Sequence, residues 1–272
     1  MAAEYEESTR QTSRVPLRTP RVAEAVAAQL RLRIIEGDLD EGSELPTEAV
    51  LLTEFPASRP SLREAFRILE TEGLLTVRRG KRGGTVIKSP TPDSAAYHMG
   101  LLLHSNSTPL MDLAAARNLL EPLCAEQASL RPDHADVGRS LAALNDECAK
   151  VVEDGFAFTD AAIEFHEALV DAAGNQTLRV ITGMLESVWS AQEKGWAKEA
   201  TSEESYPEVD LRLAVLKAHG AIADAITRGD AETAVRLTQS HLKASQLYVA
   251  SEGSQPVRVL DDYGSSTMTP RG

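Results

Sequence analysis

Three histidines in the second half of the chain have the type and spacing of metal ligands: His166, His219 and His241. Each has apolar residues three or four positions away, as Ile163 and Leu169 are to His166. At this spacing the apolar residues and the histidine lie on the same face of a helix, so each imidazole is expected to face a helical core. Three inward imidazoles can converge on a divalent metal ion such as zinc and leave coordination positions open. Core histidines that each bond to a neighbour are the alternative, and the residues alone leave both interpretations open.

The stretch from Ser58 to Glu70 carries chemistry of a second kind. Its polar and basic residues gather at the start, and they are Ser58, Arg59, Ser61 and Arg63. Apolar residues follow at helical spacing and predict a helix with one buried face. Ser58 can cap this helix, and Pro60 suits its first turn. Short hydrogen-bonding side chains and guanidinium groups at a helix N-terminus suit phosphates and base edges, which indicates contact with DNA.

The elements before this stretch predict a helix-turn-helix. A first helix is expected from about Arg21 to Glu36 and ends at Gly37. A second helix begins after Thr47, which can cap it, and is broken at Pro56. In such a motif the second of two short helices is the one that enters the major groove, which is here the helix that starts at Ser58.

A basic β-hairpin is predicted after the third helix. Leu74–Val77 and Thr85–Ile87 have the pattern of antiparallel strands, and the turn from Arg78 to Gly84 holds four cations and three glycines. Cations on a tight turn repel one another, and a polyanion relieves that repulsion. The hairpin tip, Lys81 included, is therefore expected to lie along duplex DNA.

The charge is unevenly distributed. The net charge of −13 alone disfavours nucleic acid as a partner, yet the segment from Arg10 to Lys88 holds 14 basic and 11 acidic residues, a net of +3. The remainder holds 14 basic and 30 acidic residues, a net of −16. This asymmetry indicates a nucleic-acid-binding module joined to an acidic one.

Other features bound the class of protein. No apolar run approaches the roughly 20 residues that cross a bilayer, and the acidic N-terminus does not have the pattern of a secretory signal, so no membrane partner is expected. Cys124 and Cys148 lie in helical patterns without a CxxC pair. They are typical of core residues in a reduced, cytoplasmic protein.

The predicted fold class is mainly α: a winged helix-turn-helix of three helices and a β-hairpin, followed by an all-α antiparallel bundle. The bundle helices are expected near 110–130, 134–154, 158–173, 176–199, 207–228 and 230–251. The expected division is an arm without fixed structure over 1–20, the winged helix over 21–89, a linker over 90–108 marked by Ser89–Pro92, the bundle over 109–251, and a disordered tail over 252–272. Within the linker, a short helix is expected over 93–104.

The first module resembles the winged helix of GntR-type bacterial transcription regulators from about Val22 to Lys88. The residues that carry the resemblance include Gly37, Gly42, Leu45-Pro46, Glu48, Ser58-Arg59, Arg63-Glu64-Ala65, Glu72-Gly73-Leu74 and Gly80. The resemblance implies that Ser58, Arg59, Ser61, Arg63, Arg79 and Gly80 read DNA. Ala49 stands where the family usually has Arg, and Pro60 where it usually has Thr, which implies an altered operator preference.

The second module resembles the FCD ligand-binding domain of the FadR-like branch of that family, from about Leu110 to Val249. The segments that match are AIEFHEALVDAAGNQTL, HGAIADAITRGDAETAV and SHL. Members often hold a metal with one Asp and three His, and the three histidines match, whereas Ala162 occupies the usual Asp position and Asp160 points to another face. Arg117 matches an arginine that commonly faces the ligand pocket, and its anion is either an effector carboxylate or Glu121.

The expected function is that of a ligand-responsive transcription regulator and not of an enzyme. The family resemblance implies that the regulator is a repressor. As a homodimer it would bind a palindromic operator in double-stranded DNA and sense a small organic acid in the helical domain. Two alternatives stay open: a three-His metalloenzyme, and a DNA-binding regulator without a small-molecule effector.

Overall fold

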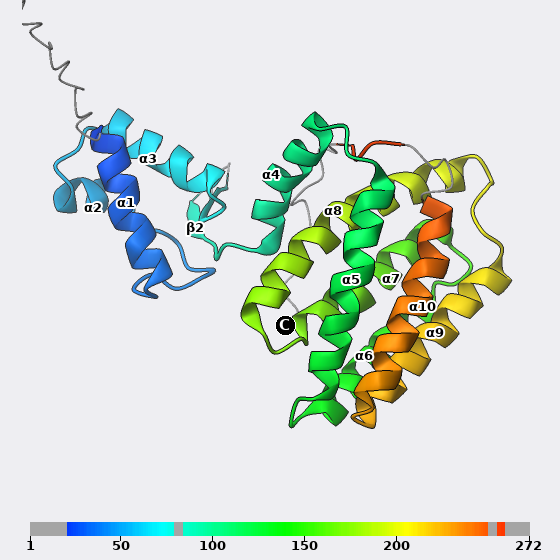
Figure 1. Ribbon diagram of the computed structural model, residues 1–272. Helices are drawn as coiled ribbons and strands as arrows, with labels where there is room; N and C mark the ends of the chain where they lie inside the picture. The colour runs from blue at the N-terminus through cyan, green and yellow to red at the C-terminus, as the bar shows by residue number, and fades with distance from the viewer. Residues whose placement is uncertain (1–20, 79–83, 250–254, 259–272) are drawn as a thin grey trace, which may run out of the picture. The chain divides into compact units, whose positions relative to one another are not determined.

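The chain folds into two compact units that divide after Pro90 (Figure 1). The computed structural model describes residues 21–78, 84–249 and 255–258. The predictions for the arm over 1–20 and for Arg79, Gly80 and Lys81 in the wing lie outside these residues. Both units are mainly helical, and the predicted fold class is confirmed.

The first unit is a winged helix. It consists of α1 (Val22–Ile35), α2 (Glu48–Glu54), α3 (Arg59–Thr71), β1 (Leu75–Val77) and β2 (Thr85–Ile87). The expected caps are present, since the Thr47 hydroxyl accepts from the N–H of Val50 at 3.4 Å and the Ser58 hydroxyl from that of Ser61 at 3.3 Å. These bonds satisfy N–H groups that a helix start leaves free, and they fix where α2 and α3 begin.

One apolar core holds the winged helix together. Its fully buried side chains include Leu30, Leu51, Leu62 and Leu69. The strands β1 and β2 are antiparallel, with Thr76 opposite Val86. The segment before α2 joins the edge of β2, because the N–H of Leu45 donates to the Thr85 carbonyl at 2.7 Å. The stem of the wing is thereby fixed to the same core as α3.

The second unit contains seven helices within its described residues (Figure 1). They are α4 (Pro92–Ser105), α5 (Leu110–Ser129), α6 (His134–Ala149), α7 (Gly155–Asp171), α8 (Gln176–Ser202), α9 (Val209–Thr227) and α10 (Ala231–Val249). Asp154 and Asn175 cap α7 and α8 through their side-chain oxygens. Helices α5 and α7–α10 carry the side chains of the candidate site, and α6 packs against α9.

The short linking helix expected over 93–104 is present as α4, and it packs on α8 with Ala96 fully buried in the cluster that contains Trp189. The structure differs from the expected division in the tail. Residues 255–258 of the expected tail pair with the start of α5, and Val257 is fully buried. A single buried valine in a polar stretch is too weak a pattern for sequence analysis to detect.

Both cysteines are free and buried, in agreement with the sequence analysis. None of the described helices is long and apolar enough to cross a membrane.

Close packing between α6 and α9 positions the helix that carries His219. A Cβ atom at Gly138 would lie 2.6 Å from the backbone nitrogen of Thr227 and 2.7 Å from the carbonyl oxygen of Ala223. Both atoms belong to the α9 backbone, which cannot move aside as a flexible side chain can. We therefore expect Gly138→Ala to lower the free energy of unfolding by about 1–3 kcal/mol, measured by urea denaturation.

Gly220→Ala on α9 is the matched control. A Cβ atom there would meet Asn145 Nδ2 at 3.6 Å, an ordinary contact. Because alanine is the better helix former, this variant should be between unchanged and about 1 kcal/mol more stable. Equal effects of the two substitutions would contradict the close approach of α6 and α9.

Candidate functional site

The polar start of α3 faces solvent in the first unit. Ser58, Arg59 and Arg63 are exposed, and Ser61 is partly buried. The Ser58 and Ser61 hydroxyls lie 2.9 Å apart. The guanidinium of Arg63 contacts the Glu48 carboxylate on α2 through Nε at 2.9 Å and Nη2 at 3.4 Å. This exposed pair holds the Arg63 side chain beside the N-terminus of α3, where a phosphate or a base edge can replace the carboxylate.

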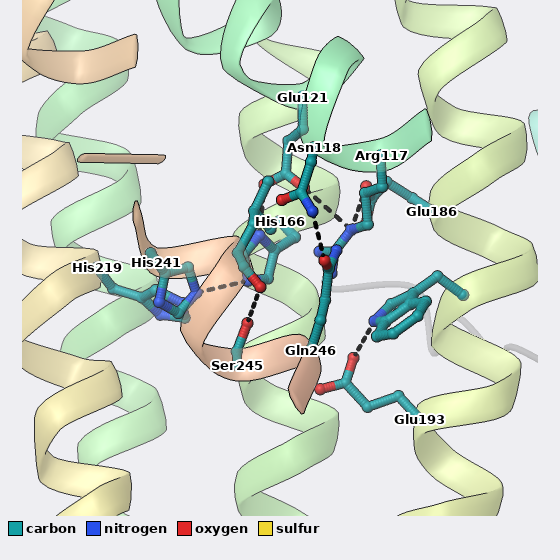
Figure 2. A network of polar contacts seen from close by, with 12 residues as sticks. Arg117, Asn118, Glu121, His166, Glu186, Glu193, His219, His241, Ser245 and Gln246 are labelled. Atoms are coloured by element: carbon teal, nitrogen blue, oxygen red, sulfur yellow. Dashed lines mark hydrogen bonds and ion pairs between the residues drawn. The ribbon is translucent and has the colours of Figure 1, made fainter. Parts of the chain in front are cut away.

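The three histidines meet inside the second unit (Figure 2). His166 comes from α7, His219 from α9 and His241 from α10, and all three are buried. The Nε2 atom of His241 lies 3.1 Å from that of His219 and 3.2 Å from that of His166. The prediction that all three imidazoles face the interior is confirmed.

Neighbouring side chains fix the orientation of two of these rings. Nδ1 of His166 lies 2.5 Å from Oε1 of the buried Glu121. The carboxylate accepts from Nδ1–H, so the Nε2 lone pair of His166 faces the other imidazoles. The His219 ring stacks on Phe165 with centroids 4.0 Å apart and an angle of 3° between the planes. His166 therefore has the second-layer hydrogen bond that is typical of metal-binding histidines, whereas Nδ1 of His219 is buried without a hydrogen-bond partner among the described residues.

A buried arginine organises the acidic side of the cluster. Nε of Arg117 lies 2.7 Å from Oε1 of Glu186 and 3.1 Å from Oε2 of Glu121 (Figure 2). The guanidinium also lies 5.5 Å from the centre of the Trp189 ring. Burial raises the pKa of Glu186 to about 7 and also raises the pKa of Glu121, while Arg117 opposes both shifts. Of the two anions that the sequence analysis considered for Arg117, the structure shows Glu121, together with Glu186.

The donor set fits a divalent metal ion. Zinc–nitrogen bonds of about 2.0–2.1 Å put neighbouring ligand atoms roughly 2.9–3.4 Å apart in octahedral to tetrahedral geometry, and the two Nε2 separations fall in that range. Burial lowers the pKa of His166 to about 3 and lowers those of His219 and His241 well below the ordinary value. The imidazoles are therefore neutral, which is the form that binds metal.

The usual fourth ligand position is occupied by a residue that cannot bind a metal. Ala162 lies one turn before His166 and lines the cavity beside the imidazoles. Asp160 is exposed and forms an ion pair with Lys194 at 2.6 Å, away from the cluster. The sequence analysis is confirmed on this point, and Ala162 leaves open space where an aspartate would stand.

A cavity extends from the imidazoles to the loop between α8 and α9. Its volume open to the centres of water molecules is about 60 Å³. Its polar lining consists of Arg117, Thr159, His166, Glu193, Tyr206, Arg212, His219, His241 and Ser245. Sequence analysis missed Glu186, Glu193, Tyr206 and Arg212. Glu186 had a detectable signal, because it stands within an apolar run of α8 between Leu185 and Val188.

Two family models match the chain. The model described as "Bacterial regulatory proteins, gntR family" matches residues 22–87, and the model of the FCD domain matches residues 112–244. The chain therefore has a gntR-family DNA-binding domain followed by an FCD domain. Its two units are those of a DNA-binding transcription regulator with a ligand-sensing FCD domain, and the resemblance seen in the sequence is confirmed.

Curated relatives and a solved structure agree with this assignment. The chain is 27% identical over 223 residues to the galactonate operon transcriptional repressor of Escherichia coli, which covers 81% of this chain and 93% of that repressor. It is 28% identical over 230 residues to a putative L-lactate dehydrogenase operon regulatory protein of Escherichia coli, with 82% and 84% of the two chains covered. The structure of Streptococcus agalactiae GntR shares the fold, with a TM-score of 0.57, 24% identity, and 82% and 98% coverage.

The buried ion pairs make a prediction about Arg117. We expect Arg117→Met to lower the free energy of unfolding by about 3–5 kcal/mol, because it leaves Glu121 and Glu186 buried without a countercharge. The deficit should shrink as the pH falls, since protonation of raised-pKa carboxyls removes the uncompensated charge. Urea denaturation at several pH values measures both effects.

Arg131→Met is the matched control, because Arg131 pairs with Asp133 on the surface. Its loss should change stability by about 0–1 kcal/mol. A similarly small effect of Arg117→Met would contradict the structural role of the buried pairs.

The imidazole cluster predicts metal binding that depends on each histidine. We expect the protein to retain about one divalent ion per chain after dialysis, and His219→Ala to lose most of it, because two imidazoles hold zinc weakly. Elemental analysis of both proteins measures the content. His98→Ala, which removes an exposed histidine of α4, is the control and should retain the ion. Equal metal content in all three proteins would contradict the site.

Proposed function

We propose that this protein is a ligand-responsive repressor that binds a palindromic operator as a homodimer and senses a small carboxylate in its FCD domain. The observation that supports the proposal is the convergence of three neutral imidazoles in the wall of a cavity, in a chain whose other unit has an exposed recognition helix. The cavity binds and does not catalyse, as in relatives that are regulators. The proposal places the protein in the cytoplasm, together with DNA.

DNA recognition is assigned to the start of α3 and to the wing. Arg59 and Arg63 would contact bases and phosphates, with Ser58 and Ser61 at the helix N-terminus beside them. The wing residues Arg79, Gly80 and Lys81 would follow the backbone of the duplex, where glycine permits close approach. Two copies related by a two-fold axis would place two α3 helices on two half-sites.

A divalent ion would be held by His166, His219 and His241. It would supply positive charge that attracts a carboxylate, in a site that otherwise has an acidic excess. Glu121, Glu186 and Glu193 surround Arg117, and burial raises the pKa of Glu193 as it does those of the other two. Because these carboxylates alone would repel an anion, the proposed effector depends on the ion.

The size and lining of the cavity support a small acid as effector. Each ordered water occupies roughly 10–15 Å³ of space of this kind, so about 60 Å³ holds a few waters or a small metabolite. Arg117 lines the cavity with its charge shared between Glu121 and Glu186, so we propose for it a supporting contact with the effector. Two of the relatives have names that refer to galactonate and to L-lactate dehydrogenase, and both names refer to hydroxy acids.

The proposed function is tested with DNA from upstream of the protein's own gene. Wild type should bind a palindromic fragment with an affinity that falls steeply as salt rises, and an effective acid should weaken binding when zinc is present. Arg63→Ala should weaken specific binding about tenfold or more, because a bidentate base contact is lost. The variant should keep the thermal shift that the acid causes, since the second unit is unchanged.

Arg139→Ala is the control for loss of an exposed arginine in the second unit, and it should bind the operator as wild type does. Failure of the wild type to bind any DNA at low salt would overturn the proposal that the protein is a transcription regulator. DNA binding without an acid response in a screen of organic and sugar acids would overturn the sensing role.

A further inference from the structure

The cavity has two chemically different ends, and α7 runs between them. His166 and Thr159 lie seven positions apart on α7, and both line the cavity, as does Ala162 between them. Seven residues of α-helix rise by roughly 10 Å. The cavity therefore has a long axis, and Ala162 leaves its middle open.

The end that lies away from the imidazoles is built from the start of α9 and the loop before it. The Tyr206 hydroxyl lies 2.6 Å from the Thr159 hydroxyl, and the Tyr206 ring contacts Trp196 with centroids 5.3 Å apart. The guanidinium of Arg212 lies 4.9 Å from the centre of the Tyr206 ring. Tyr206 is thus fixed through its hydroxyl and its ring, and the cation of Arg212 lies over that ring.

Arg212 is held rigidly by groups that leave its charge intact. Its Nε donates to the Pro207 carbonyl at 2.9 Å and its Nη1 to the Val152 carbonyl at 2.5 Å. Both acceptors are neutral, whereas the other arginine that lines the cavity, Arg117, is paired with two buried carboxylates. Among the described residues that line the cavity, Arg212 is therefore the arginine whose charge is available to a bound anion.

We infer that Arg212 and Tyr206 form a second acid-binding point, so that the effector is a dicarboxylic acid with its two carboxylates at opposite ends of the cavity. This inference rests on the proposed function, which places the first carboxylate at the imidazole end. Arg212 and the Tyr206 hydroxyl bind the second carboxylate. The chain between the carboxylates, aliphatic or hydroxylated, lies along Ala162.

The dimensions of the cavity set the length of the diacid. About 60 Å³ open to the centres of water molecules corresponds to four to six waters. These displace about 120–180 Å³ of liquid volume at roughly 30 Å³ each. This is the volume of an acid with four to six carbons. A six-carbon diacid also spans most of the distance between His166 and Thr159.

The experiment compares matched pairs of acids by calorimetric titration of the zinc-loaded full-length protein. The pairs are adipate with hexanoate and galactarate with galactonate. The two acids of a pair have the same number of carbons and differ at one terminal carbon. That carbon is a carboxylate in the diacid, a methyl group in hexanoate and a hydroxymethyl group in galactonate. In at least one pair, wild type should bind the diacid about tenfold tighter or more than the monoacid, as a charged hydrogen-bonded contact provides. Arg212→Gln should remove this preference and leave the affinity for the monoacid within about twofold of wild type.

Three further variants separate recognition from folding. Arg212→Lys keeps the charge and loses the planar fork, so it should retain part of the preference. Tyr206→Phe should reduce the preference without changing the binding of the monoacid. Lys217→Gln removes an exposed cation from the same helix and should bind every acid as wild type does. Melting temperatures of the ligand-free variants show whether each one is folded.

The outcomes distinguish the two levels of the proposal. If wild type binds monoacids and diacids equally, or if Arg212→Gln weakens both equally, the second acid-binding point is wrong and the sensing role stands. If wild type binds none of these acids or any other organic acid, the proposed sensing function fails and the inference fails with it. Loss of the diacid preference in Lys217→Gln would also overturn the inference, because the effect would then be one of general charge.

Discussion

The ion pairs between Arg117, Glu121 and Glu186 are the constraint on which the ligand-binding unit depends. They join α5 to α8 in a region where the three side chains are at most 3% exposed. The transfer of three charged groups from water is unfavourable, and it is offset only when their geometry satisfies each of them. Such a cluster tolerates little movement, so it fixes the two helices against each other more strictly than apolar packing alone would.

The same cluster determines the chemistry of the imidazoles. Glu121 uses one oxygen for Arg117 and the other for Nδ1 of His166, so the ion pair and the orientation of the first imidazole are one structural unit. The surplus of carboxylates beside Arg117 favours a cation nearby and disfavours a free anion. A site built in this way is suited to bind a metal first and an acid only afterwards. Under the proposed second acid-binding point, selectivity for a diacid would depend on Tyr206 and Arg212, which line the same cavity.

Much of this arrangement could be predicted from the sequence, and the limits have physical causes. Helical spacing places His166 among apolar neighbours, and side-chain caps such as Ser58 depend on local sequence, so both were predicted correctly. The partners of Arg117 depend on long-range packing. Glu121 could be predicted as a partner only because it lies one helical turn after Arg117. Glu186 and Arg212 belong to other helices, and no local pattern shows which pairs of helices meet. The burial of Val257 was not predicted, because it depends on a single contact that leaves no periodic signal in the sequence.

Helix α8 joins the lining of the cavity to the first helix of the second unit. This helix carries Glu186 and Glu193, and α4 packs along it with Ala96 buried in the contact. Helix α4 begins at Pro92, directly after the boundary between the units. The segment around Val257 packs against both of these helices. The Gln192 side chain on α8 forms two hydrogen bonds with the Arg258 backbone. The Val257 carbonyl accepts a hydrogen bond from the His104 ring on α4. A ligand can shift an equilibrium only by contacts that differ between two states. A ligand that moved α8 would therefore change the packing of α4, the first helix of the second unit.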